Sequence, residues 1–185
     1  MALSQQKFRE IVFQLLYSQE LGHPSDDLMI DLMMNELSVS KRNVRLALER
    51  VQQIQQHLTE IDQSISSVST SYDFERIQTV TKTILRVGVF ELFFDSHIPP
   101  KVAIAEAIRL SRKFSTPESA SFANALLDQL YRQKEGQHVD LTTMEKLTLS
   151  LKESEETAAE IAQEHPLRPE PENEEDEPDQ PFPSL

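Results

Sequence analysis

The amino-acid sequence predicts an all-α protein of about six to seven helices that ends in an acidic tail. Residues 1–136 contain three glycines, four prolines and no Asn-Gly or Asp-Gly pair of the kind that closes a β-hairpin. Apolar residues in this stretch recur at steps of three and four, which is the spacing of one helix face, and they do not alternate as strand residues do. We therefore expect a single helical domain over residues 1–136, long enough to bury a core.

Three helices are expected before residue 70. Ser4 can cap the first, which ends near residues 22–24, and Ser25 can cap the second. From about Ser40 the apolar steps continue without a gap, so we expect one long helix that lies across the others and ends in the serine-rich residues 64–71. The apolar residues of this long helix are Val44, Leu48, Val51, Ile54, Leu58, Ile61 and Ile65.

The most apolar segment of the chain is residues 74–94, which ends in the sequence ILRVGVFELFF. A helix that is apolar on every side is a buried one, so we expect this segment to be the central element. Its charged residues Arg86 and Glu91 are expected to pair with each other or with a neighbour rather than with a ligand. Two more helices follow, over residues 99–114 and 116–133, because proline at a first helical position favours a start there.

The formal net charge of −13 is concentrated at the end of the chain. Residues 153–185 hold twelve of the 31 acidic residues, one of the 18 basic residues and six of the ten prolines, which leaves 19 acidic and 17 basic residues before them. Such a composition cannot offset the entropy of ordering, so we expect residues 163–185 to form a disordered acidic tail. Residues 137–162 carry apolar residues at helical spacing and can form one extra helix.

Several classes of function are excluded by what the sequence lacks. Without cysteine there is no disulfide, thiolate nucleophile, zinc-thiolate site or iron–sulfur cluster. The five histidines are too far apart to share a metal, and three isolated glycines build no phosphate-binding loop, so we expect no metal, no cofactor and no enzyme activity. The first residues do not resemble a signal peptide and no run of 18 apolar residues occurs, so we expect a cytoplasmic protein without a membrane segment.

The first helix carries a second apolar stripe, formed by Phe13, Tyr17 and Leu21, beside the stripe that faces the core. Two stripes indicate a helix that is enclosed within the protein or one that meets a partner, and the sequence leaves both open. The hydroxyl group of Tyr17 favours a position at a boundary. A partner-binding surface on this stripe is therefore one of two expectations.

Basic residues gather at two places in the near-neutral body. Lys7 and Arg9 lie in the opening turns of the first helix, where a positive charge opposes the helix dipole at a cost of about 0.3–1 kcal/mol each. A phosphate partner would explain them, and ordinary solvated charges are the alternative. Residues 101–134 carry a local charge balance of +3. Within them, Phe122 can either stack on an unpaired base or pack into the core.

Two stretches of the chain resemble the hallmark region of the NusB transcription antitermination family: IPPKVAIAEAIRLSRKF at residues 98–114 and FANALLD at residues 122–128. Further matches are KFREIVFQLLYSQEL near the start and ILRVGVFEL in the middle, so the resemblance spans residues 7–131. It implies an all-α fold of two small packed helical bundles. It also implies a non-enzymatic adaptor that pairs with the ribosomal protein NusE, binds single-stranded boxA RNA of nascent ribosomal transcripts and joins the RNA polymerase antitermination complex.

The resemblance also implies two contact surfaces. One surface binds RNA and is made by the start of the first helix and the region around the start of the last one. The other binds the ribosomal protein and is made by the later part of the first helix and the start of the central helix. The residues expected to bind RNA are Lys7, Arg9, Lys101, Lys113, Glu118 and Phe122. From the apolar stripe and the resemblance together, the residues expected to bind the partner are Phe13, Tyr17, Leu21, Glu75, Arg76 and Thr81.

The sequence departs from the family pattern where contacts are implied. Family members usually open with a cluster of arginines, whereas this chain has Gln5 and Gln6 beside Lys7 and Arg9, and Thr81 stands where an acidic residue is usual. Each missing phosphate contact removes about one unit of salt slope, so we expect weak unaided RNA binding. The alternative is a protein-only helical interaction module whose RNA-binding surface has decayed. An rRNA cytosine methyltransferase with a similar helical domain is excluded because the chain has no cysteine to serve as the catalytic residue.

Overall fold

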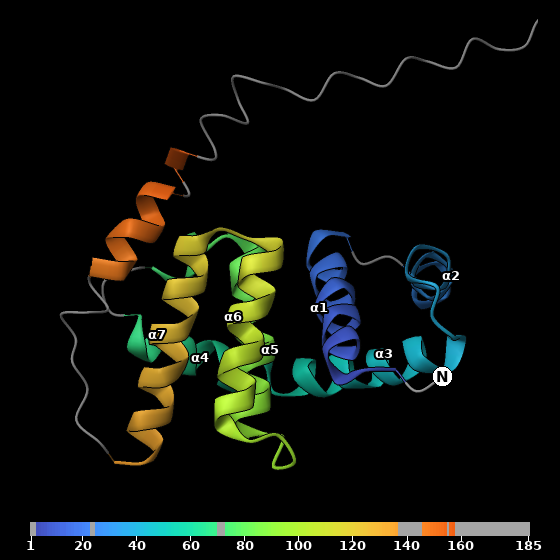
Figure 1. The fold of residues 1–185 in the computed structure, drawn as a ribbon, viewed down its shortest axis with the longest axis horizontal. Coiled ribbons are helices and arrows are strands. Elements are labelled where there is room, and N and C mark those ends of the chain that lie inside the picture. Colours follow the sequence, from blue (N-terminus) through green and yellow to red (C-terminus); the bar gives the residue numbers. More distant parts are fainter. Residues whose placement is uncertain (1–2, 23–24, 70–72, 137–145, 155, 158–185) are drawn as a thin grey trace, which may run out of the picture.

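The computed structural model describes residues 3–22, 25–69, 73–136, 146–154 and 156–157 of the chain. These residues form helices and turns and contain no strand, so the predicted all-α class is confirmed (Figure 1). The elements are α1 (Gln5–Gly22), α2 (Asp26–Leu37), α3 (Lys41–Gln56), α4 (Leu58–Val68), the 3₁₀ turn η1 (Phe74–Arg76), α5 (Thr79–Phe93), α6 (Pro100–Phe114) and α7 (Pro117–Lys134).

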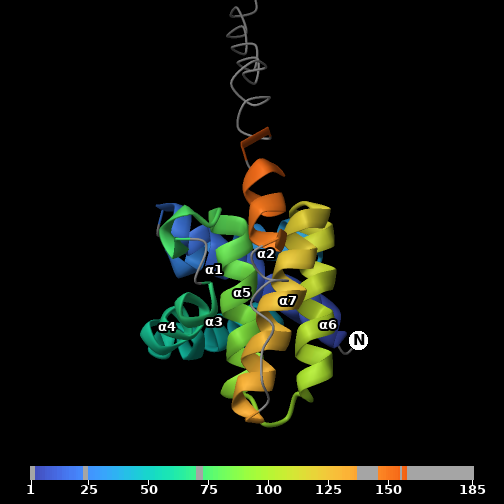
Figure 2. The same ribbon diagram turned by 90° about the vertical axis from the view of Figure 1, so that its left-hand side faces the viewer.

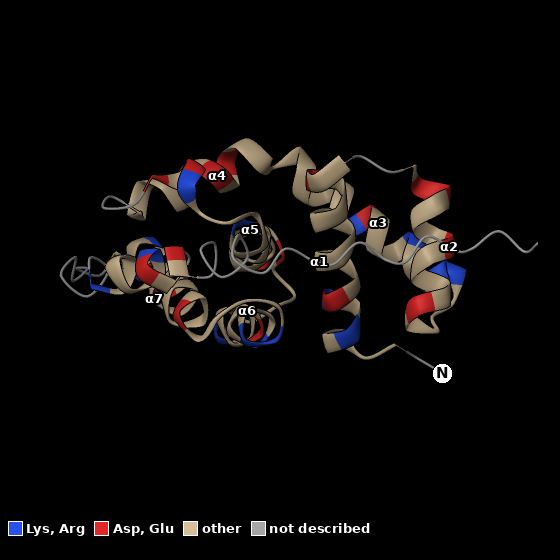
Figure 3. Ribbon diagram, turned by 90° about the horizontal axis from the view of Figure 1, so that it is seen from above, with Lys and Arg blue, Asp and Glu red and all other residues tan. Residues whose placement is uncertain are grey.

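The helices form two bundles that lie side by side. In the first bundle, α1 and α2 both pack against α3, and in the second, α5 contacts α4, α6 and α7. The bundles meet where α1 packs against α5, and α3 leads directly into α4 (Figures 1 and 3). Two packed bundles are the arrangement that the family resemblance implied.

Hydroxyl groups cap the helix starts, as predicted for Ser4 and Ser25. The hydroxyl groups of Ser4, Ser25, Ser40 and Thr116 each accept a hydrogen bond from the backbone N–H three residues later. This bond satisfies one of the N–H groups that a helix leaves unpaired at its first turn. Proline occupies one of the first two positions of both α6 and α7, where its missing N–H is not needed.

The single long helix predicted after Ser40 is wrong, because the structure breaks it at His57. This residue lies between the end of α3 and the start of α4 and leaves the helical conformation, with φ −105° and ψ 10°. Its ring stacks on that of Phe94, with the centroids 4.2 Å apart. The apolar steps of three and four continue through the break, so periodicity alone does not reveal it. The break allows α3 to pack on α1 while α4 packs on α5 and α7.

The central helix begins later than predicted, because residues 74–76 form η1 and two extended residues separate it from α5. Eleven of the 15 residues of α5 are buried, as expected for the central element. Gly88 allows the neighbouring helices to approach closely. A Cβ atom at Gly88 would lie 3.0 Å from Leu127 Cδ1 on α7 and 3.2 Å from Ala107 Cβ on α6.

The charged residues of α5 pair with neighbours, as predicted. Arg86 donates two hydrogen bonds of 2.8 Å to the carboxylate of Asp62 on α4, and its Nη1 lies 2.9 Å from Glu20 on α1. Burial acts to lower the pKa of Arg86, but the two carboxylates outweigh it and raise the pKa. Glu91 accepts hydrogen bonds from Arg9 on α1. Both residues therefore hold helices together.

A further helical segment, residues 146–154, lies against the start of α7 (Figure 2). Leu151 of this segment is fully buried and belongs to the hydrophobic core. The hydroxyl group of Ser154 donates to Glu118 Oε2 at 3.1 Å and lies 3.3 Å from the hydroxyl of Thr116. The segment therefore covers part of the surface on which the RNA contact Glu118 was predicted.

The C-terminal predictions are only partly within the described residues. The segment above lies inside residues 137–162, where the sequence allows one extra helix. The acidic tail predicted to be disordered, residues 163–185, lies outside the described residues. Within the part of the chain that is described, no helix is long and apolar enough to cross a bilayer.

We expect Leu151→Ala to lower the free energy of unfolding by about 2–5 kcal/mol, because it removes a fully buried leucine side chain from the core. Leu149 is the matched control, since it lies on the same segment and is 61% exposed. Leu149→Ala should change the free energy of unfolding by less than about 0.5 kcal/mol. Urea denaturation of both variants measures the difference, and equally small effects would show that the segment does not dock.

Candidate nucleic-acid and partner interface

The start of α1 carries two basic residues. Arg9 is paired with a buried carboxylate, and Lys7 forms no ion pair among the described residues. Arg9 is only 5% exposed, and its Nε lies 2.7 and 2.9 Å from the two carboxylate oxygens of Glu91 on α5. Its Nη1 also lies 3.7 Å from Glu106 on α6. Lys7 is partly exposed and forms no ion pair within the described part of the chain. Of these two predicted RNA contacts, Lys7 has a charge available to phosphate, whereas Arg9 joins α1 to α5.

Glu10 is the centre of a second set of ion pairs between α1 and α6. Its Oε1 lies 2.6 Å from Arg109 and its Oε2 lies 2.8 Å from Lys113, while Arg109 also lies 3.0 Å from Glu106. Burial acts to raise the pKa of Glu10, but the hydrogen bonds from Lys113 and Arg109 outweigh it, so the pKa lies below its ordinary value. Lys113 remains half exposed. This predicted RNA contact is accessible, although its charge is shared with Glu10.

The other predicted RNA contacts lie around the starts of α6 and α7. Lys101 is exposed in the first turn of α6 and forms no ion pair among the described residues. A hydrogen bond from its own backbone N–H lowers the pKa of Glu118, and the hydroxyl group of Ser154 acts in the same direction. Phe122 has no exposed surface and lies in the core. Of the two alternatives that the sequence left open for Phe122, the structure has core packing, and stacking on a base would require the ring to leave the core.

The apolar stripe of α1 passes from the core to the surface. Phe13 is buried, and its ring centroid lies 4.8 Å from that of Phe114 and 5.9 Å from that of Tyr17. Tyr17 is partly buried, and Leu21 is 64% exposed. The stripe therefore lies partly inside the protein and partly at its surface. Phe13 belongs to the core and supports Tyr17, whereas a partner can reach Leu21.

The remaining predicted partner contacts lie just before and within the start of α5. Glu75 and Arg76 belong to η1 and are exposed. Thr81 is fully buried, and its hydroxyl group donates to Ser119 on α7 at 3.2 Å. Thr81 therefore packs α5 against α7 and does not reach the surface in this structure.

Arg86 lies between the two segments that carry the predicted partner contacts. It lies 2.9 Å from Glu20, near the end of α1, and its guanidinium stands 5.8 Å from the ring centroid of Phe74 in η1. Since one side chain touches both segments, the end of α1 and η1 are close in space although far apart in sequence. The exposed predicted partner contacts that they carry are Leu21, Glu75 and Arg76.

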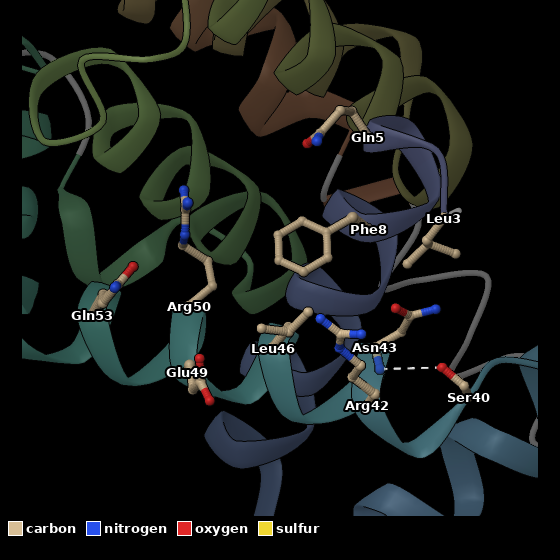
Figure 4. Close-up of a pocket in the computed structure, with 10 residues that line it drawn as sticks. All are labelled: Leu3, Gln5, Phe8, Ser40, Arg42, Asn43, Leu46, Glu49, Arg50 and Gln53. Atoms are coloured by element: carbon tan, nitrogen blue, oxygen red, sulfur yellow. Dashed lines mark hydrogen bonds between the residues drawn. The ribbon is translucent and has the colours of Figure 1, made fainter. Parts of the chain in front are cut away.

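A groove between the start of α1 and α3 was not singled out by the sequence (Figure 4). Its volume is about 640 Å³. Figure 4 shows the ring of Phe8 in the middle of the opening, with Arg42 and Arg50 on either side and Leu46 beneath. The residues that line it are Leu3, Gln5, Phe8, Ser40, Arg42, Asn43, Leu46, Glu49, Arg50 and Gln53.

The start of α3, at one end of this groove, is basic. Lys41, Arg42 and Arg45 are exposed, and the first turn of the helix contains no acidic residue. None of the three forms an ion pair with another described residue. A signal for them was present in the sequence KRNVR directly after the cap Ser40, because cations in the first turns of a helix oppose its dipole.

Comparison with known proteins identifies the family. Residues 6–132 match the profile of the NusB family. The chain belongs to the NusB family. Transcription antitermination protein NusB of Chlamydia pneumoniae is 35% identical over 127 residues, which are 69% of this chain and 79% of that protein. NusB of Desulforamulus reducens is 30% identical over 133 residues, which cover 72% of this chain and 93% of that protein. The resemblance stated from the sequence is confirmed.

Solved NusB structures share the fold. T. maritima NusB has a TM-score of 0.63 and 24% identity, and the likeness covers 78% of this chain and 99% of that one. A structure of antitermination factors NusB and NusE in complex with dsRNA has a TM-score of 0.60 and 23% identity, over 70% of this chain and 96% of the other. The NusB profile ends at residue 132, so the helical segment 146–154 lies outside the family match.

We expect Arg9→Gln to lower the free energy of unfolding by about 3–5 kcal/mol, because it leaves the buried carboxylate of Glu91 without its partner. Lys7→Gln, in the neighbouring turn, should change it by less than about 0.5 kcal/mol. Urea denaturation at neutral pH compares the two variants. A small effect of Arg9→Gln on stability, together with a large loss of RNA affinity, would show that Arg9 meets phosphate instead.

Proposed function

We propose that this chain is a transcription antitermination factor that binds boxA-like single-stranded RNA together with the ribosomal protein NusE. It acts as a non-catalytic adaptor in the RNA polymerase antitermination complex, in the bacterial cytoplasm. Membership of the NusB family over residues 6–132 is the observation that carries this proposal. The relatives are named transcription antitermination proteins, and one solved neighbour holds NusB with NusE and dsRNA.

In this proposal the RNA surface consists of the predicted contacts whose charges remain accessible. Lys7 and Lys101 form no ion pair among the described residues, and Lys113 is half exposed. Glu118 lies at the start of α7, which follows the end of α6 that carries Lys113, and can accept hydrogen bonds from bases. Two further predicted contacts, Arg9 and Phe122, are buried beneath this surface and hold α1 and α7 in place.

The NusE surface consists of the side of the molecule where the end of α1 and η1 come together. Tyr17 and Leu21 supply apolar area and Glu75 and Arg76 supply charges at its edge. Phe13 and Thr81 support this surface from the interior. A small apolar centre with a charged rim is the usual composition of a transient protein interface.

Few free cations on the RNA surface favour a bipartite mechanism. Each protein makes weak contacts with one RNA strand, and the heterodimer binds more tightly than either subunit because the second set of contacts forms at high effective concentration. The two lysines without a carboxylate partner among the described residues, Lys7 and Lys101, would contribute a salt slope of about −1.4 on a single strand, since each contact adds about −0.7. Such a slope supports modest affinity from this chain alone.

The proposal predicts that NusE raises RNA affinity by at least about tenfold, because linked weak contacts commonly gain that much or more. Filter retention of a boxA-like single-stranded RNA, with and without NusE at two salt concentrations, measures the gain. Lys7→Gln with Lys101→Gln should weaken the heterodimer and flatten its salt slope by about 1.4. The control is Arg132→Gln, which removes an exposed charge paired with Asp128 near the end of α7.

The rival is a protein-only interaction module whose RNA surface has decayed. It is favoured if the double lysine variant binds RNA as the unmodified protein does while NusE still binds. If NusE produces no enhancement at all, the antitermination proposal fails.

The acidic tail is proposed to compete with RNA for the weakly basic body. Residues 152–185, which include the tail, hold twelve acidic residues and two basic residues, and Ser154 already contacts Glu118. Charges linked to a surface in this way lower its local potential and so its attraction for phosphate. The competition should weaken as salt shortens the range of electrostatic interactions.

Deletion of residues 152–185 is expected to raise the RNA affinity of the heterodimer severalfold at low salt and little at high salt, because the Debye length falls from about 10 Å at 0.1 M to about 3 Å at 1 M. The matched control is a full-length chain in which Asn and Gln replace the acidic residues of the tail. Filter retention that rises equally for both variants assigns the effect to charge. Unchanged affinity in both would leave the tail without a role in RNA binding.

A further inference from the structure

The groove between α1 and α3 continues toward the predicted RNA contact Lys101. A second hollow of about 380 Å³ shares Gln5, Phe8 and Arg50 with the first and is also lined by Pro99 and Val102. Pro99 and Val102 flank the first turn of α6, which carries Lys101. One continuous depression therefore runs from the start of α3, past the start of α1, to the start of α6.

The floor and rim of the groove have the chemistry that a nucleobase requires. The ring of Phe8 is partly exposed at its middle, and Leu46 is 44% exposed beside it (Figure 4). Gln5, Asn43 and Gln53 stand around them and carry amide groups that both donate and accept hydrogen bonds. Stacking on an aromatic ring with amide groups at the base edge is how proteins bind unpaired bases.

The charges of the groove favour an anionic occupant. The acidic residues Glu91 and Asp95 of the second hollow are already neutralised, because Glu91 pairs with Arg9 and Asp95 lies 2.5 Å from Arg50. Among the described residues that line the first hollow, Glu49 is the only acidic one. Arg42 is a lining cation that forms no ion pair with another described residue, and Lys41 and Arg45 are exposed nearby at the start of α3, outside the lining.

The start of α3 also supplies positive charge that the start of the chain lacks. The first turn of α1 has Gln5 and Gln6, and Arg9 forms an ion pair with Glu91. Among the described residues at this helix start, Lys7 is the cation without a carboxylate partner. The fold brings the start of α3 to the opposite side of the same groove. Arg42 thus stands across the groove from the place where α1 lacks arginines, and Lys41 and Arg45 are exposed beside it at the start of α3.

We infer that the groove between α1 and α3 is an RNA subsite, in which Phe8 stacks on one base and Arg42 meets the adjacent phosphate, while the exposed Arg45, three residues further along α3, meets a phosphate outside the groove. The inference rests on the proposed function, because it extends the same RNA surface beyond Lys7 and Lys101. The RNA strand follows the depression from the start of α3 to the start of α6.

Two variants of the full chain in complex with NusE test the subsite, with fluorescence anisotropy of a labelled boxA-like single-stranded RNA as the readout. Arg42→Gln with Arg45→Gln should weaken binding about tenfold at low salt and reduce the salt slope by about 1.4, since two phosphate contacts are lost. Phe8→Leu should weaken binding about fivefold or more at every salt concentration, because stacking is not screened. Arg132→Gln is the control that should change neither quantity.

The outcomes separate the subsite from the proposed function. If Lys7→Gln with Lys101→Gln weakens binding while the two arginine substitutions leave both affinity and slope unchanged, the subsite is wrong and the function stands. If the heterodimer binds no RNA, both the subsite and the proposed function are wrong. An unchanged affinity of an arginine variant that instead loses binding to NusE would make the groove a protein site and overturn the inference.

Crosslinking tests the same inference without any substitution. A boxA-like RNA that carries 4-thiouridine is irradiated in complex with the full chain and NusE, and the crosslinked peptides are identified by mass spectrometry. Crosslinks to residues 3–9 or 41–53 are expected, because these segments form the two walls of the groove. Crosslinks confined to other segments would overturn the subsite.

Discussion

The buried ion pair between Arg9 and Glu91 is the constraint on which the arrangement of the molecule depends. It joins α1 of the first bundle to α5, the central helix of the second. A buried charge is tolerated only when its partner is in place, so neither helix can shift along the other without leaving a charge uncompensated. Because α1 carries predicted contacts at both ends, Lys7 and Leu21, this pair also sets where the two proposed surfaces stand.

A second guanidinium fixes the other end of α1. Arg86 of α5 lies against Glu20, and the pair Arg9 and Glu91 lies nearer the start of α1. Two separated ion pairs define both the position and the direction of α1 on α5, which one pair could not do. The ion pairs of Arg9 and Arg86 therefore lie at the junction of the two bundles. They hold the surfaces on either side of this junction in one geometry.

The local features of the fold could be predicted from the sequence, and the long-range ones could not. The caps at Ser4 and Ser25 depend on a few neighbouring residues, and so does apolar periodicity. The break at His57 interrupts one residue within an intact apolar pattern, so no local signal marks it. Whether the charge of Arg9 is available to a ligand depends on Glu91, which lies 82 residues away in the chain.

The proposed site shows why a count of charges is a poor guide to phosphate binding. Lys7 and Arg9 look alike in the sequence, yet one charge is free and the other is neutralised inside the protein. The basic start of α3 was not among the predicted contacts, although its sequence KRNVR was visible after Ser40, and Arg42 and Arg45 form no ion pair with another described residue. Phosphate attraction depends on the cations that have no carboxylate partner and face a shared depression. In the proposed complex, these few unpaired cations set where an RNA strand lies on a body close to neutral, and their small number favours tight binding only with a second RNA-binding subunit.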